Sequence, residues 1–206
     1  MIPKLHWHWN QPYQESLKWQ QNRRTLVQQD PANRAILLCE HPPTITLGKR
    51  GGTIHHHRQD TTIEQLHRGG LATWHGPGQL AFYPIMPIQH DGIGIKRYVC
   101  VLEKCIIRVL QTFQIDAHHG ESPGIWVQHK KIASIGLDVR SGVAIHGIAI
   151  NVQTDLTRFQ DLICCGDPQL QFTSMQQEIN TRVPLLNVGH ACIHEFMKAY
   201  HDARRG

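Results

Sequence analysis

Apolar and polar residues are ordered most clearly between positions 96 and 113. Apolar side chains recur there at alternating steps of three and one, while Lys96, Arg97, Glu103, Lys104 and Arg108 take the other side. This period predicts an amphipathic helix of about four turns lying on a core. Its apolar stripe consists of Tyr98, Val101, Leu102, Cys105, Ile106, Val109, Leu110 and Phe113.

Weaker patterns predict helices near both ends of the chain. Residues 13–29 form a polar, moderately amphipathic segment that stops before Asp30 and Pro31. A last helix is expected over about residues 189–203, where apolar side chains again share one stripe.

Two short segments carry helix-capping signals. Thr61 and Glu64 have the spacing of a capping box, so a short helix is expected to follow them and to end at Gly69. Asp155 is expected to cap a brief helical turn that reaches Phe159.

Elsewhere the period is that of strands. Residues 34–40 and 44–47 are predicted as two strands bounded by turn residues. Residues 124–128, 132–139 and 143–152 predict three further strands, and the tight turns between them favour an antiparallel meander.

Residues 80–88 are rich in strand formers but contain two prolines, which predicts an edge strand or an irregular one. Together the elements indicate an α/β fold with a mixed or antiparallel sheet flanked by helices. The length of 206 residues and the 40% hydrophobic content suit one domain over residues 1–206.

Composition narrows the functional classes. No run of about 18 apolar residues is present, so no membrane span is expected. The N-terminal residues lack an apolar signal core, which favours a cytoplasmic protein. The net charge of +5 is scattered without a Lys/Arg-rich block, so an acidic protein partner is expected rather than nucleic acid.

Three consecutive histidines, His55, His56 and His57, raise the possibility of a metal-binding or carrier protein. Neighbouring side chains in regular structure cannot all face one ion, and no Cys-x-x-Cys pair accompanies them. A solvated loop without a metal is therefore the preferred interpretation.

The segment at residues 68–79 combines four glycines and a proline with Arg68, Trp74, His75 and Gln79. Glycine allows a close approach of backbone to a ligand, but the same residues are typical of a simple turn between strands. The local pattern alone leaves both interpretations open.

Lys131 and the Cys164-Cys165 pair are the candidates for chemistry. If the strand face of Lys131 is buried, withdrawal from water favours the neutral amine, whereas its charged form would stabilise a nearby thiolate. Cys165 precedes Gly166 in a turn-like context that a substrate could reach. A thiolate beside a lysine would support acyl transfer through a thioester. A solvated lysine and an inert cysteine remain the alternatives.

Five segments, in order and at matching spacing, resemble the lipoyl (octanoyl) transferase family. They are residues 40–48, 68–79, 131–136, 146–152 and 162–166. The resemblance implies the fold shared with the catalytic domains of biotin and lipoate protein ligases. It also implies transfer of an octanoyl group from octanoyl-acyl carrier protein to a lysine of lipoyl domains. The acceptors implied are 2-oxoacid dehydrogenase E2 subunits and the glycine cleavage H protein.

By the same resemblance, Cys165 carries the acyl thioester and Lys131 activates it. No cofactor or metal is implied, and Trp74 and His75 are expected to shape the thioester end of the pocket. The residues expected to bind the acyl group and its thioester are Arg68, Gly69, Gly70, Leu71, Ala72, Thr73, Trp74, His75, Ser134, Ile135, Gly136, Gly147, Ile148 and Ala149.

The chain departs from the family pattern at Cys164, where proline is common, at Asp167, where an apolar residue is common, and at Trp74, which replaces a tyrosine. An ATP-dependent lipoate ligase on the same fold is the rival enzyme. It would need a nucleotide-phosphate loop, and residues 68–70 lack the extended glycine run that such a loop would have.

Overall fold

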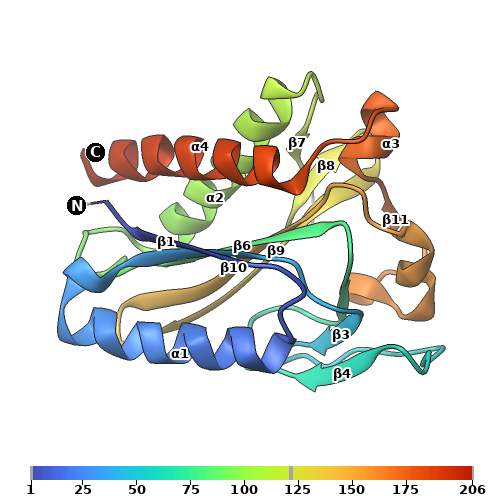
Figure 1. Ribbon diagram of the computed structural model, residues 1–206, viewed down its shortest axis with the longest axis horizontal. Helices are drawn as coiled ribbons and strands as arrows, with labels where there is room; N and C mark the ends of the chain where they lie inside the picture. The colour runs from blue at the N-terminus through green and yellow to red at the C-terminus, as the bar shows by residue number, and fades with distance from the viewer. Residues whose placement is uncertain (1, 121–122, 206) are drawn as a thin grey trace.

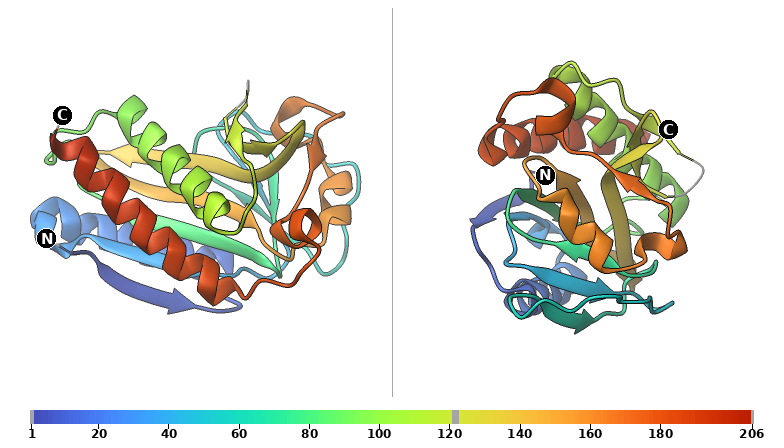
Figure 2. Two further views of the ribbon diagram at one scale, coloured as in Figure 1. Left: turned by 90° about the horizontal axis from the view of Figure 1, so that it is seen from above. Right: turned by 90° about the vertical axis from the view of Figure 1, so that its right-hand side faces the viewer.

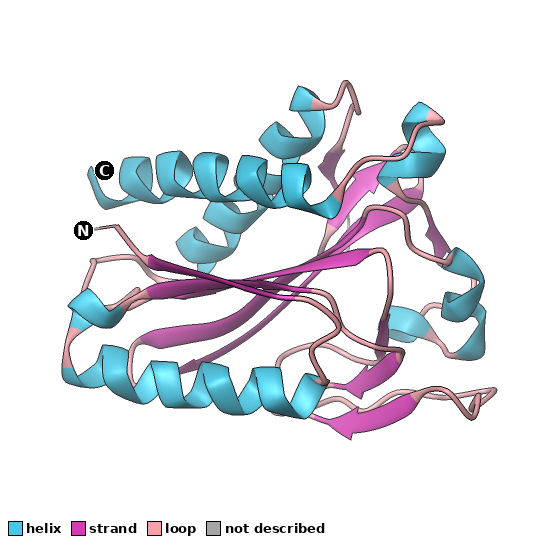
Figure 3. Ribbon diagram, viewed as in Figure 1, coloured by secondary structure: helices cyan, strands magenta, loops and turns pink. Residues whose placement is uncertain are grey.

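The computed structural model describes residues 2–120 and 123–205, except the side chain of Cys165. This part of the chain contains an eight-stranded sheet, a three-stranded sheet and several helices (Figure 3). Helix α1 covers one face of the large sheet, and α2 and α4 cover the other (Figure 1). The α/β fold with helices on both sides of the sheet is therefore confirmed.

The helices are α1 (Tyr13–Gln29), α2 (Ile95–Thr112), α3 (Met175–Ile179) and α4 (Leu185–Arg205), with short 3-10 helices η1 (Pro31–Asn33), η2 (Leu156–Asp161) and η3 (Cys164–Gly166). The strands are β1 (Lys4–His8), β2 (Ala35–Cys39), β3 (Thr44–Leu47), β4 (Thr62–Gln65), β5 (Thr73–His75), β6 (Gln79–Ile85), β7 (His118–His119), β8 (Ile125–Val127), β9 (Lys130–Arg140), β10 (Val143–Asn151) and β11 (Gln171–Phe172).

The large sheet is mixed. Its order is β1-β2-β6-β10-β9-β8-β7, with β11 pairing β9 off this path. β1 runs parallel to β2 and β11 parallel to β9, whereas the remaining neighbours are antiparallel. β8, β9 and β10 form the predicted meander. The small sheet, β4-β3-β5, lies at one end of the large one (Figure 1).

The predicted helices form largely as expected. α1 has the predicted bounds, and α2 begins three residues before Tyr98. All the residues of the predicted apolar stripe of α2 are buried except Phe113, which is partly buried against the same core. α4 is longer than predicted at both ends. Asp155 caps η2, because its side chain accepts a hydrogen bond from the amide of Thr157.

The helix predicted after Thr61 is wrong, because residues 62–65 form β4. This strand pairs in parallel with β3, from Thr44 opposite Thr62 to Leu47 opposite Gln65. A segment of this length does not form a stable helix by itself, whereas pairing with the free edge of β3 provides hydrogen-bond partners for its backbone groups. Gly69 consequently ends no helix, and its amide donates to the carbonyl of Leu137 at 3.0 Å.

Residues 80–88, predicted as an edge strand or an irregular one, form an irregular strand. β6 lies in the sheet interior, between β2 and β10. Its ladder with β10 covers Gln79 to Phe82, and Pro84 falls in the gap before the next bridge at Met86. A Cβ on Gly147 would overlap the carbonyl oxygen of Phe82, so β10 needs glycine here. The break in pairing is what accommodates an interior proline.

Three apolar clusters hold these layers together. The largest lies between the sheet and the pair α2 and α4, which cross it side by side (Figure 2). A second lies under α1. The third joins the small sheet to η2 and η3 through Trp74, Phe159 and Cys164. The third cluster therefore sets where the segment containing Cys165 runs. No helix in the described residues is long and apolar enough to cross a bilayer.

Candidate active site

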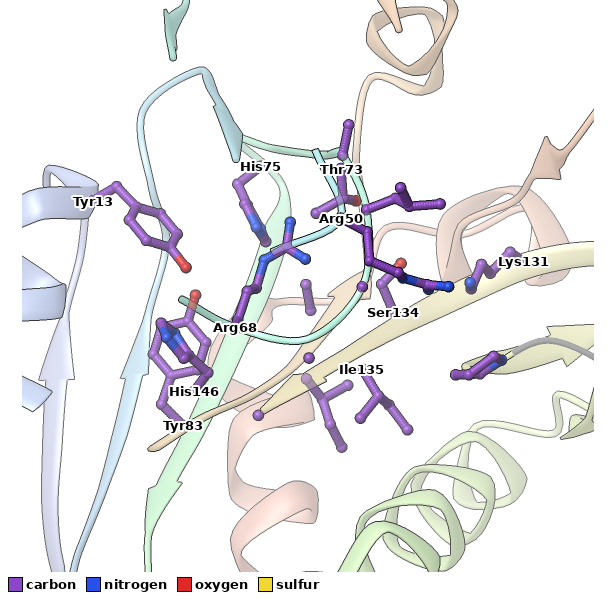
Figure 4. A pocket seen from close by; sticks show the side chains of 18 residues that line it. Tyr13, Arg50, Arg68, Thr73, His75, Tyr83, Lys131, Ser134, Ile135 and His146 are labelled. Atoms are coloured by element: carbon purple, nitrogen blue, oxygen red, sulfur yellow. The ribbon is translucent and has the colours of Figure 1, made fainter. Parts of the chain in front are cut away.

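A pocket of about 310 Å³ opens between the segment after Arg68 and the β9–β10 ladder (Figure 4). This volume is at the lower end of the range typical of small-molecule sites. Lys131 lines it, together with twelve of the residues predicted to bind the acyl group. Those twelve are Arg68, Gly70, Leu71, Ala72, Thr73, His75, Ser134, Ile135, Gly136, Gly147, Ile148 and Ala149. The fold thus brings three separate predicted segments to one cavity.

Lys131 is buried at one end of the pocket, with 1% of its surface exposed. Its Nζ lies 5.4 Å from the centroid of the Trp126 ring, and its stem runs past Gly124, where a Cβ would overlap its Cε. Gly124 also has a φ of +135°, which favours glycine. The alternative of a solvated lysine at a turn is therefore wrong for Lys131, whereas Lys130 beside it is partly exposed.

Arg68 occupies the middle of the pocket (Figure 4). Its guanidinium donates to the carbonyl of Gly69 at 2.9 Å and to both oxygens of Thr46, at 2.8 Å for the carbonyl and 2.7 Å for the hydroxyl. These bonds fix a buried positive charge between the small sheet and β9. Arg68 therefore helps to hold the pocket wall in place.

The inner end of the pocket is built from rings. Tyr13, His75, Tyr83 and His146 converge there from α1, β5, β6 and β10 (Figure 4). His41 lies behind them, 5.9 Å from the ring centroids of both His75 and Tyr83. His75, predicted to shape the thioester end of the pocket, thus lies at the end of the cavity opposite Lys131 (Figure 4).

Hydrogen bonds hold two of these histidines in one tautomer. The Nδ1 of His41 lies 2.8 Å from the carbonyl of Gln11, which can only accept, so Nδ1 carries the proton. Nε2 of His41 is then free to accept from the hydroxyl of Tyr83 at 3.0 Å. In the same way, Nδ1 of His75 donates to Oε1 of Gln79 at 2.7 Å.

The histidines at the inner end are neutral at pH 7. Burial lowers the pKa of His41 to about 4 and that of His146 to about 3. Burial also holds the pKa of His75 well below its usual value, and the nearby His41 and Arg68 add to this. Burial raises the pKa of Tyr13 to about 12. This end of the cavity is thus a hydrogen-bonding surface whose rings carry no charge.

Trp74 and Gly69 were predicted to bind the acyl group, but they lie outside the pocket lining. Alternation along β5 points Thr73 and His75 into the pocket and Trp74 to the other side. There the Trp74 ring meets Phe159 edge to face, at 5.8 Å between centroids. Trp74 is therefore a packing residue that supports the wall from behind.

The segment of Cys165 runs directly behind the pocket wall. η3 contains its backbone, while its side chain lies outside the described residues. A Cβ on Gly166 would lie 2.9 Å from Cδ1 of Leu71, which lines the pocket. The adjacent Cys164 is 2% exposed and packs in the third cluster with Trp74 and Phe159.

The sequence prediction missed five residues that line the pocket: Tyr13, Arg50, Tyr83, Pro123 and His146. His146 opens one of the segments that carried the resemblance, and its φ of +61° is unusual for a histidine. Tyr13 and Tyr83 stand in ordinary helix and strand patterns. Their role follows from which faces α1 and β6 turn inward, so no local signal marked them.

The three consecutive histidines lie on the loop between β3 and β4, and their side chains are exposed. Nε2 of His57 lies 2.7 Å from the carbonyl of Thr61. Among the described residues, no group of three or more His, Cys, Asp or Glu side chains is arranged to hold a metal ion.

Solved structures place this architecture among the lipoate and biotin protein ligases. Lipoate-protein ligase A bound with ATP has a TM-score of 0.75 at 16% identity, over 98% of this chain and 86% of that one. A biotin protein ligase from Aquifex aeolicus has a TM-score of 0.59 at 10% identity, over 100% of this chain and 72% of that one. At these low identities the TM-scores show a shared fold and no more, and this confirms the fold expected from the sequence.

Residues 12–197 match the lipoyl protein ligase A/B catalytic domain, and the chain belongs to that family. A protein named octanoyltransferase from Shewanella halifaxensis is 38% identical over 144 residues. That match spans 69% of this chain and 66% of the relative, slightly less than two thirds of its length. An octanoyltransferase from Shewanella oneidensis is 35% identical over 179 residues, which span 80% of this chain and 82% of that protein.

Proposed function

We propose that this protein transfers an octanoyl group from octanoyl-acyl carrier protein to a lysine of lipoyl domains, through a thioester on Cys165. The observation that carries the proposal is Lys131, buried at the end of a pocket whose wall, at Leu71, packs against Gly166. The names of the relatives agree with this activity. No cofactor or metal is required, because the thioester of the donor is already activated.

The first half of the reaction loads the enzyme. Lys131 takes the proton of the Cys165 thiol or, when charged, stabilises its thiolate. The sulfur attacks the carbonyl carbon of the octanoyl thioester, so that one carbon–sulfur bond forms as the bond to the carrier breaks. The carrier leaves as a thiol after taking up a proton. Backbone amides of the glycine-containing wall would stabilise the oxyanion.

The second half transfers the acyl group. The amine of the acceptor lysine attacks the carbonyl carbon, an amide bond forms, and the bond to Cys165 breaks. Lys131 accepts the proton that the amine loses. The acceptors proposed are lipoyl domains of 2-oxoacid dehydrogenase E2 subunits and the glycine cleavage H protein. A lipoate protein ligase with the same fold, from Thermoplasma acidophilum, has been solved as a system with its E2 lipoyl domain, with a TM-score of 0.71 at 17% identity.

Encounter with both partners would be helped by charge. Carrier and lipoyl domains are typically acidic, and this chain carries a net charge of +5. We further propose that residues 1–206 act as one catalytic domain in the cytoplasm, without a nucleic-acid or membrane partner.

Intact-mass measurement after incubation with octanoyl-acyl carrier protein tests the acyl-enzyme directly. We expect a mass gain of one octanoyl group, located on Cys165 by peptide mapping. Hydroxylamine, which cleaves thioesters, should remove this mass gain. Cys165→Ser should abolish both the transfer and the hydroxylamine-sensitive mass gain. Cys164→Ser is the matched control and should stay active, because Cys164 packs in the third cluster. Reversed behaviour of the two variants would refute the assignment of the nucleophile.

Lys131→Met tests the role of the lysine while keeping most of its length. We expect acyl-enzyme formation to slow by about 100-fold or more, the range typical of a lost proton-transfer group. Alkylation of Cys165 by iodoacetamide should then require a higher pH. Lys130→Met is the control, since this partly exposed neighbour lies outside the pocket. An unchanged alkylation profile in Lys131→Met would exclude activation by Lys131.

One further assay distinguishes the proposed function from the rival function, an ATP-dependent lipoate ligase. We expect no transfer from free octanoate or lipoate to a lipoyl domain when ATP and Mg²⁺ replace the loaded carrier. Transfer that depends on ATP would establish the rival instead.

A further inference from the structure

The inner end of the pocket has no part in the transfer chemistry proposed above. Tyr13, His75, Tyr83 and His146 form this end, on the far side of Arg68 from Lys131 (Figure 4). We propose that this ring wall stops the acyl chain and makes the enzyme select octanoyl over longer chains. The inference rests on the proposed function, because it requires the thioester to lie beside Lys131.

The direction of the acyl chain follows from the two ends of the cavity. With the carbonyl carbon near Lys131, the chain would run past Ile135 and Arg68, which lie between Lys131 and the rings (Figure 4). Its methyl end would then face the ring wall, which lies on the other side of Arg68 from Lys131 in Figure 4. The lining before the rings thus combines the apolar side chains of Ile135 and Ile148 with Arg68, and it changes to aromatic and imidazole rings at the end.

The wall closes the pocket from solvent. The exposed fractions are 3% for Tyr13, 5% for His75, 3% for Tyr83 and 3% for His146. A chain too long for the cavity cannot pass between them into water. It would have to displace a side chain, bend within the pocket, or leave its carbonyl short of the reactive end.

Hydrogen bonds make the wall resistant to displacement. His75 is bound to Gln79, which also donates to the carbonyl of Trp74 at 3.2 Å and to Oδ1 of Asn151 at 3.0 Å. Tyr83 is bound to His41, which is in turn fixed to the backbone of Gln11. Moving either ring breaks bonds between groups that are buried and cannot find water instead.

The chemistry of the wall also disfavours additional methylenes. Its rings present nitrogens and hydroxyls that an apolar chain cannot pair with. Nδ1 of His146 is buried without a hydrogen-bond partner among the described residues. Pressing a methylene against such atoms leaves polar groups covered and unpaired, which is costly. Size and polarity therefore act in the same direction, against longer chains.

His146→Gly is the sharpest variant for testing the stop. Glycine adopts the positive φ of this position readily, and the amide that donates to Oε1 of Gln20 at 2.8 Å is retained. The substitution removes only the imidazole. Tyr13→Leu provides an independent variant of the same wall, at the first residue of α1.

The measurement is a competition between octanoyl- and dodecanoyl-acyl carrier protein for a limiting amount of enzyme. The ratio of the two acyl-enzymes is read by intact mass. We expect the unmodified protein to favour octanoyl by at least about tenfold, since even one methylene changes selection by 10-fold or more. His146→Gly and Tyr13→Leu should each lower this ratio by about tenfold. Ile106→Ala, a cavity in the core under α2, is the control and should leave the ratio unchanged.

Each outcome has a separate meaning. If neither acyl group loads the unmodified protein, the proposed function fails. If octanoyl loads but both wall variants retain the original ratio, the stop is disproved while the function stands. If Ile106→Ala lowers the ratio equally, general loosening explains the effect and the inference also fails. If one wall variant does not fold, the other decides.

Discussion

Two sets of three histidines behave in opposite ways in this protein. His55, His56 and His57 are consecutive in the chain and lie exposed on the loop between β3 and β4. The other set, His41, His75 and His146, comes from three separate segments and is buried behind and within the pocket wall.

The difference teaches that proximity in sequence and proximity in space carry different information. Consecutive side chains on an irregular loop point in different directions and remain hydrated. Side chains from separate strands and helices can be packed together, and burial then changes their chemistry. Burial lowers the pKa of each histidine in the second set, and neighbouring charges lower those of His75 and His146 further.

The largest expected effect of this difference is on stability in acid. The buried histidines stay neutral in the folded state below pH 6.5, whereas in the unfolded chain they take up protons. Folded-state stability is therefore present above about pH 6.5 and lost as the pH falls towards 4 for His41 and 3 for His146. Each group contributes up to about 1.4 kcal/mol per pH unit.

Urea unfolding at several pH values between 7 and 4.5 measures how steeply the free energy of unfolding falls as the pH is lowered. His41→Gln should reduce this slope by the contribution of one histidine, whereas His55→Gln should not change it. Equal slopes for the parent protein and His41→Gln would show that His41 is protonated in the folded state.

The next effect concerns the loss of a side chain from each set. His75→Ala creates a cavity and removes the partner of Oε1 of Gln79, so we expect unfolding to require about 2–4 kcal/mol less. His56→Ala should change the free energy of unfolding by less than about 0.5 kcal/mol. Chemical denaturation at pH 7 compares them, and similar losses would contradict the distinction between the sets.

A smaller effect is expected from the contacts that anchor the loop between β3 and β4, which involve its backbone and Arg58 and not its histidine side chains. The loop is held beside η2 by the amides of His55 and His56, which donate to the carbonyl of Asp161 at 2.8 Å and 3.0 Å. Arg58 adds two bonds to the Asp161 carboxylate, at 2.7 Å and 3.2 Å. Arg58→Ala should therefore cost about 1 kcal/mol. Arg58→Lys should restore part of it, and a loss below that of His56→Ala would argue against this anchoring.

The smallest expected effect is on metal binding. Replacing all three loop histidines with glutamine should leave the stability and any weak zinc binding of the protein unchanged. Zinc titration of the parent protein and the variant compares them directly. Tight, stoichiometric binding that disappears in the variant would make the loop a metal site after all.

Much of the fold could be predicted from local patterns. The stripe of α2, the bounds of α1 and the β8–β10 meander each depend on periodicity within one segment. Two other features have the opposite origin. β4 is a strand because β3 offers it an edge, and β6 is interior because a break in the ladder admits Pro84. Neither feature can be predicted from the sequence of the segment alone.

The candidate site likewise has features that the sequence predicted and features that it did not. The order of five short segments indicated the family, and twelve of the predicted residues line one pocket together with Lys131. The direction of individual side chains was less accessible. Trp74 faces away from the cavity and His75 faces its inner end, because alternation in β5 acts only once the strand is placed against β3.

The sequence by itself therefore determined the family, the glycine-containing wall and the pairing of a lysine with a cysteine loop as the candidates for chemistry. These features are short, local and ordered along the chain. Only the tertiary structure decided that Tyr13, His75, Tyr83 and His146 close one cavity, and that Cys164 packs in the core. Contacts between segments far apart in sequence depend on how whole elements pack, and no local pattern records that packing.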